Sequence, residues 1–180
     1  GLTQQATQAY LWALPLVSYA QWQKEFSEKL GARNGDLMQL NTYEDKLGVL
    51  TANATTPYIL GFVDLNKTGP LVIELPPGPT AGGVGDFWQR AMIDMGQTGP
   101  DKGEGGQYLV LPPGTTPPTD ADKYYVTHSD TMNVLVGFRV LDPDPAKGKA
   151  LVEKFKMYPY ADRANPSPTR LLTPQGKAWS

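Results

Sequence analysis

Clusters of glycine and proline divide the middle of the sequence into short runs of β-forming residues. The 19 glycines and 17 prolines make up a fifth of the chain, which is above the usual share but below that of unstructured low-complexity sequence. The runs between these clusters are candidate strands at residues 57–65, 71–75, 85–95, 107–111, 123–128 and 133–141. Short strands with such regular turn signals favour an antiparallel β-sandwich or a barrel-like sheet. The five-residue connection 66–70 predicts that the first two runs form a hairpin.

Helices are expected on both sides of this β-rich region. Residues 3–30 carry apolar side chains at helical spacing, interrupted at Pro15, and a long connection with a short strand near 47–50 follows. After the last strand, Asp144 before Pro145 is typical of a helix start. One C-terminal amphipathic helix is predicted from there, with Leu151, Phe155 and Tyr158 on its apolar face. The fold class is therefore α+β.

Length and charge narrow the class of protein. At 180 residues and 19.6 kDa the chain is expected to be a single β-rich domain, with residues 160–180 as a linker toward an absent downstream domain. A net charge of −2 gives no clustered basic excess, so nucleic acid is not an expected partner. No apolar window is long enough for a transmembrane segment.

The run 85–95 carries the most informative side-chain pattern. Strand alternation would place acidic, aromatic and basic side chains on one face, at Asp86, Trp88, Arg90, Met92 and Asp94. This face is interpreted as the wall of a ligand pocket. The alternative is a structural ion pair on a solvated face, which is the commoner arrangement.

The candidate site residues follow from that interpretation. Aromatic and charged side chains expected to bind a ligand are Trp12, Tyr58, Trp88, Arg90 and Asp94, and weak acid–base candidates are Asp86, Asp94 and His128. His128 is the only histidine and the chain has no cysteine, so neither a two-histidine metal site nor a thiolate site can form. We expect no metal and no cofactor.

Several ordered segments resemble one family. They are residues 9–17, 53–58, 64–65, 69–72, 86–89, 99–103 and 108–114. Together they resemble domain-of-unknown-function family 1254 along nearly the whole chain. Two positions depart from its pattern: Thr55 stands where many members have Asp, and Ala13 stands where Gly is usual. The resemblance implies a downstream β-rich domain of family 1214 and a bacterial protein that is periplasmic or secreted.

Three functions remain open. The first is a small-molecule-binding domain, with a site that a downstream domain completes for enzymatic action. The second is a hydrolase that uses the Asp and His groups named above. The third is a non-catalytic assembly module, which also allows a homo-oligomer.

Overall fold

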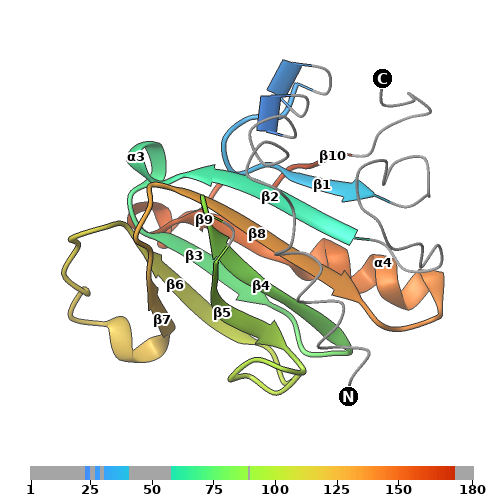
Figure 1. Cartoon of the computed structure of the whole chain (residues 1–180). Helices are drawn as coiled ribbons and strands as arrows, with labels where there is room; N and C mark the ends of the chain where they lie inside the picture. The colour runs from blue at the N-terminus through green and yellow to red at the C-terminus, as the bar shows by residue number, and fades with distance from the viewer. Residues whose placement is uncertain (1–22, 25–26, 29–30, 41–57, 89, 173–180) are drawn as a thin grey trace.

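The computed structural model describes residues 23–24, 27–28, 31–40, 58–88 and 90–172. Within the expected helix 3–30, residues 23–24 and 27–28 are helical, and the rest of that segment lies outside the described residues, as does the strand expected near 47–50. The described part is mostly β-sheet, with two mixed sheets and two short α-helices, which agrees broadly with the α+β class (Figure 1). None of the described helices has the length and apolar character needed to cross a membrane.

The larger sheet, called sheet A, has six strands. Their spatial order is β10 (Leu171–Leu172), β1 (Leu37–Leu40), β2 (Tyr58–Asp64), β8 (Asn133–Val140), β4 (Thr80–Asp86) and β5 (Ala91–Gly96). β2 and β8 pair antiparallel along seven residues, from Tyr58 opposite Arg139 to Asp64 opposite Asn133. Every residue of β4, the neighbour of the edge strand β5, is buried, so this strand is covered on both faces.

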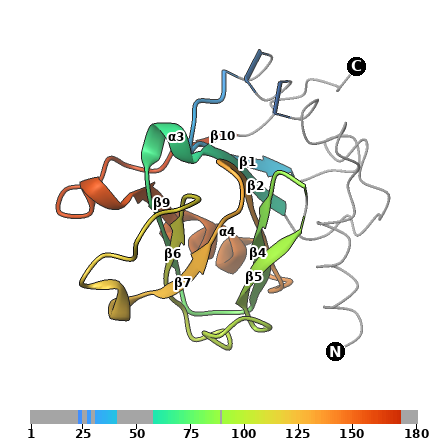
Figure 2. The ribbon, with the colours of Figure 1, turned by 60° about the vertical axis from the view of Figure 1, so that its left-hand side comes forward.

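The smaller sheet, called sheet B, has four strands. Their order is β7 (Tyr125–His128), β6 (Gly106–Leu111), β3 (Leu71–Leu75) and β9 (Lys156–Pro159). β7 runs parallel to β6, and in sheet A β10 runs parallel to β1. The expectation of an antiparallel β-sandwich or barrel-like sheet is therefore wrong for these two strand pairs: the connection 112–124 carries the chain back to the start of β6 before β7 begins, and β10 joins β1 from a distant part of the chain. The two sheets do not close into a barrel (Figure 2).

One hydrophobic core lies between the two sheets. Side chains from alternate positions of both sheets fill it, among them Ile59, Val63, Ile73, Tyr108, Val136 and Phe138. α4 (Pro145–Lys154) contributes Val152 to this core. Phe155, the first residue after the helix, stacks on Phe138 with ring centroids 4.3 Å apart. Only Gly148 and Val152 of α4 are buried, so the helix packs on the core with one narrow face (Figure 2).

The start of α4 was predicted correctly and its end was not. The Asp144 side chain accepts a hydrogen bond from the Ala146 amide and caps the helix, with Pro145 in its first turn. The helix ends at Lys154, and Tyr158 lies in β9, paired with Val72. The predicted apolar face through Tyr158 is thus not confirmed, because the chain leaves the helix to join sheet B.

Two strand predictions are wrong for local reasons. β2 and β3 form no hairpin: Asp64 caps the short helix α3 (Leu65–Thr68) by accepting from the Asn66 amide, and α3 carries the chain from sheet A to sheet B. The run 85–95 is not one strand. It contains a turn that joins β4 to β5, and Asp86 and Arg90 form hydrogen bonds with each other across this turn. Runs 71–75, 107–111 and 133–141 are confirmed within one residue.

Candidate functional site

The turn between β4 and β5 holds three of the predicted site residues. Asp86 is 2% exposed; its Oδ2 accepts from Arg90 Nε at 2.9 Å and its Oδ1 from the Arg90 amide at 2.9 Å. Arg90 Nη2 also lies 3.6 Å from Asp130 Oδ2. Trp88, at the tip, is 58% exposed. Asp86 and Arg90 thus form an ion pair that closes the turn, and this contact is structural. Each oxygen of the Asp86 carboxylate already accepts a hydrogen bond from Arg90.

Tyr58 and Asp94 lie on the face of sheet A that points away from the core. Tyr58 is buried and pairs across the strands with Arg139, whose guanidinium carbon lies 5.2 Å from the Tyr58 ring centroid. Asp94 pairs with Gly83 on the same face, and partial burial raises the pKa of its carboxyl. β8 and β4 separate these two residues in the sheet. They share a face and do not share a contact.

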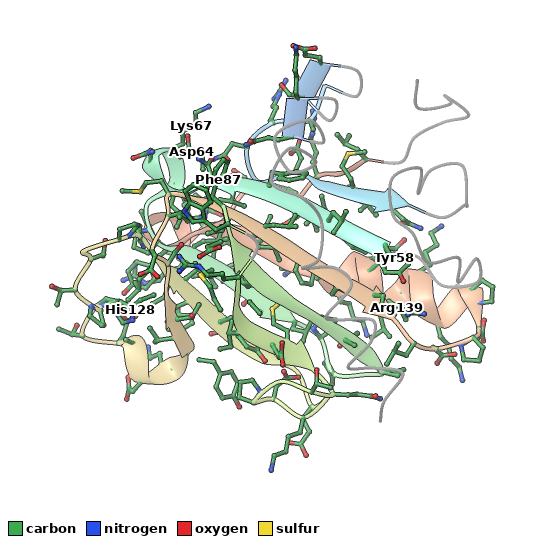
Figure 3. The ribbon with its side chains drawn as sticks, viewed as in Figure 1. Tyr58, Asp64, Lys67, Phe87, His128 and Arg139 are labelled. Carbon is green, nitrogen blue, oxygen red and sulfur yellow. The ribbon has the colours of Figure 1, made fainter. Side chains whose placement is uncertain are left out.

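The remaining predicted residues lie elsewhere. His128 is exposed at the end of β7, in the other sheet, and Trp12 lies outside the described residues. Figure 3 shows His128 apart from both Tyr58 and Phe87. Within the described residues no hydrogen bond or ion pair joins His128 to Asp86 or Asp94, although Asp130, two positions after His128, lies 3.6 Å from Arg90 Nη2. Nor does the described part of the chain hold any group of three or more acidic or histidine side chains arranged to bind a metal ion.

A pocket of about 360 Å³ opens at the end of sheet A where β2 gives way to α3. Its wall comes from the helical residues near 23–28, the loop before β1, the end of β2, and α3. Its lining residues are Gln23, Lys24, Ser27, Ala32, Arg33, Asn34, Asp36, Phe62, Asp64 and Lys67. Figure 3 shows Asp64 and Lys67 together at this end, far from Tyr58 and Arg139.

A turn from Arg33 to Asp36 forms one rim of the pocket. The Asp36 amide donates to the Arg33 carbonyl at 3.0 Å, and Asp36 Oδ2 accepts from the Arg33 amide at 2.7 Å. The same oxygen accepts from Arg170 Nη2 at 2.6 Å, next to β10. Asp36 is 9% exposed, so this carboxylate holds the turn against sheet A.

Asn34 and Asp64 tie that turn to the opposite rim. Asn34 Oδ1 accepts from the Asp64 amide at 2.7 Å, and its amide nitrogen lies 3.4 Å from the Asp64 carbonyl. The Gly35 amide donates to the Phe62 carbonyl at 3.3 Å. The backbone around the pocket is therefore fixed by contacts between segments thirty residues apart in sequence.

The cations of the pocket remain available. Arg33 and Lys67 are exposed and, within the described part of the chain, form no ion pair. Lys24 lies 4.0 Å from Glu28, with both side chains more than half exposed. Such a surface pair is weak. The pocket thus presents positive side chains from three separate segments.

Reasoning from the sequence missed this pocket. One signal was present: Asn34-Gly35 is a strong turn dipeptide, and charged residues stand on either side of it. The contact of this turn with Asp64 could not be predicted from the sequence, because it results from the pairing of β1 with β2.

Comparisons with known proteins give the fold but no chemistry. The VPA0106 protein from Vibrio parahaemolyticus is similar in structure, with a TM-score of 0.64 and 12% identity over 96% of this chain and 41% of that one. An uncharacterised protein from Burkholderia cenocepacia matches with a TM-score of 0.44 and 12% identity over 85% of this chain and 42% of that one. The chain thus spans less than half the length of either.

Two further comparisons were made on the sequence. No curated protein matches. The model of the family described as "Protein of unknown function (DUF1254)" matches residues 36–159, which include β1, the Asp64 end of β2 and α3. The chain belongs to the DUF1254 family.

Proposed function

We propose that this domain binds a small organic molecule in the pocket between the Arg33–Asp36 turn and α3. The observation that carries the proposal is the pocket itself. Its volume of about 360 Å³ falls within the roughly 300–1,000 Å³ of small-molecule sites. Most of its lining residues are polar or charged, and Phe62 and Ala32 add apolar surface.

The bonded rim supports the same proposal. Asp36, Asn34 and Asp64 hold the surrounding backbone through hydrogen bonds of 2.6–3.4 Å. A ligand that enters a preformed site loses less free energy to ordering the protein. The lining cations can therefore act on a ligand without a rearrangement of the rim.

A blocking variant tests the proposal. Ser27 lines the pocket and is exposed, so Ser27→Trp places a large ring in it, whereas Thr116→Trp adds the same ring to an exposed loop. We expect a library of small metabolites to contain compounds that raise the Tm of the wild-type protein and of Thr116→Trp. These compounds should have no effect on Ser27→Trp. Equal shifts in all three proteins would disprove binding at this pocket.

A second candidate is an enzyme site that a downstream domain completes. It is supported by the extent of the VPA0106 match, since this chain aligns with 41% of that protein. A downstream family 1214 domain, export to the periplasm and self-association belong to the same proposal. The test is turnover by a natural protein that holds both domains, on ester, amide and glycoside panels; no turnover on any panel would remove the enzyme and leave ligand binding in place.

A further inference from the structure

We propose that the ligand of this pocket is an organic anion, a carboxylate attached to an apolar body. The inference rests on the proposed function and names its ligand class. It depends on which polar groups around the pocket are already occupied and which are left for a ligand.

The two acidic side chains in the wall are committed to the protein. Asp36 Oδ2 accepts from the Arg33 amide and from Arg170, and Arg170 is not among the residues that line the pocket. Asp64 Oδ1 accepts from the Asn66 amide at 3.0 Å and caps α3. Arg170 also balances the charge of Asp36, so Asp64 is the one lining carboxylate that forms no ion pair with a described residue.

The three basic side chains in the wall are not committed in this way. Arg33 and Lys67 have no ion pair within the described residues, and Lys24 has only the long contact with Glu28. They reach the pocket from the loop before β1, from α3 and from the N-terminal helical residues. Arginine binds a carboxylate through two parallel hydrogen bonds, and lysine adds a point charge. An anion therefore meets free hydrogen-bond donors, in a wall where three basic side chains face two acidic ones of which one is already paired with Arg170.

The apolar part of the wall determines the rest of the ligand. Phe62 and Ala32 line the pocket and pack against the buried cluster of Met38, Tyr58, Leu60 and Leu135 on the outer face of sheet A. A bare inorganic anion would leave this surface in contact with water. A carboxylate with an aromatic or aliphatic body would cover it, which is favourable.

Matched probes separate the charge from the body. Phenylacetate and hexanoate carry both features, phenylacetamide and hexanamide lack the charge, and inorganic phosphate lacks the body. We expect wild-type protein to bind at least one of the two carboxylates at least tenfold more tightly than its amide and than phosphate, as measured by calorimetry. Equal or tighter binding of the amide or of phosphate would overturn the proposal.

Two double variants locate the charge. Arg33→Gln/Lys67→Gln should weaken carboxylate binding by at least tenfold, whereas Lys147→Gln/Lys149→Gln, which removes two exposed charges from α4, should change it less than twofold. Equal losses in both variants would reduce the effect to net charge and overturn the proposal.

The outcome also separates this inference from the proposed function. If the library yields only amides or amines as ligands, with binding blocked by Ser27→Trp and unchanged in Arg33→Gln/Lys67→Gln, the anion is wrong and the binding function stands. If no compound in the library binds, both fail.

Discussion

The glycine-rich loop around Asp101 and the pocket rim around Asp36 are built alike and leave different side chains free. Asp101 is 3% exposed and accepts from the amides of Gly96 and Gly105 and from the Tyr108 hydroxyl. Asp36 is 9% exposed and likewise holds a turn. In both regions a buried carboxylate accepts from the backbone of a tight loop, from two amides at Asp101 and from one at Asp36.

The difference lies in the neighbours of the two carboxylates. Tyr108, whose hydroxyl donates to Asp101, lies in the core. Gly96 has no room for a side chain, because a Cβ atom there would lie 2.3 Å from the Thr80 carbonyl oxygen. Around Asp36 the pocket side chains Arg33 and Lys67 point to an open surface. Both loops carry exposed charged side chains, Lys102 and Glu104 in one and Arg33 in the other, and the Asp36 rim differs in that Arg33 and Lys67 line the pocket of about 360 Å³.

The largest expected effect comes from Asp101→Ala. The change leaves three donors without their acceptor, and two of these, the Gly96 amide and the Tyr108 hydroxyl, are buried. We expect the free energy of unfolding in urea to fall by about 3 kcal/mol. Glu104→Ala, an exposed acidic residue in the same loop, should change it by less than about 0.5 kcal/mol. Similar values for the two variants would show that the hydrogen bonds of Asp101 do not stabilise the fold more than an exposed acidic side chain does.

Asp36→Ala should have a smaller effect. It removes the acceptor of the Arg33 amide and of Arg170, but Arg170 is partly exposed and can be solvated by water. We expect a loss of about 1–2 kcal/mol, measured in the same urea titration. Asp122→Ala, at an exposed position in the 3-10 helix Ala121–Lys123, is the matched control. A loss as large as that of Asp101→Ala would mean that the pocket rim is as deeply built into the fold as the glycine-rich loop.

Removing the unpaired cations should barely change stability. Arg33→Gln and Lys67→Gln break no ion pair within the described residues, so each should alter the free energy of unfolding by less than about 0.5 kcal/mol. The same variants are expected to weaken carboxylate binding. A clear loss of stability in either one would show a structural role and contradict the distinction between the two regions.

The smallest effect concerns Asp94 and pH. Partial burial raises the pKa of its carboxyl in the folded state, so the folded protein holds this proton to a higher pH than the unfolded chain does. The native state binds more protons in that range, and the Asp94 contribution to stability therefore falls as pH rises above about 3.8. The Tm of Asp94→Asn minus the Tm of wild type should therefore increase as the pH is raised from 3 to 7. A constant difference in Tm would contradict the shift.

Local sequence signals predicted the elements that local interactions fix. The Asp144-Pro145 start of α4 and the run 71–75 follow from capping and from β-forming residues alone. β4 was missed in part because its glycines lack strand propensity, and burial on both faces stabilises it instead. The assignment of strands to two sheets depends on α3 and on pairings across the chain, which no local pattern records.

The candidate site shows the same limit more strongly. Asp86 and Arg90 form an ion pair, but they do so across a turn and not along a strand face as the alternation of residues 85–95 suggested. The pocket residues Arg33 and Lys67 are thirty-four positions apart and carry no motif. Only the pairing of β1 with β2 brings their segments to one end of sheet A.

The parallel pairing of β10 with β1 has a consequence for how the chain is made. Leu37 lies beside Leu171, and the Asp36–Arg170 contact joins residues 134 positions apart. During synthesis on the ribosome, the Arg33–Asp36 turn therefore lacks its partner Arg170 until the intervening residues have been made. Contacts of such long range are slow to form. We therefore expect the β10–β1 pairing to form later than the β1–β2 pairing, whose residues all lie before Leu65.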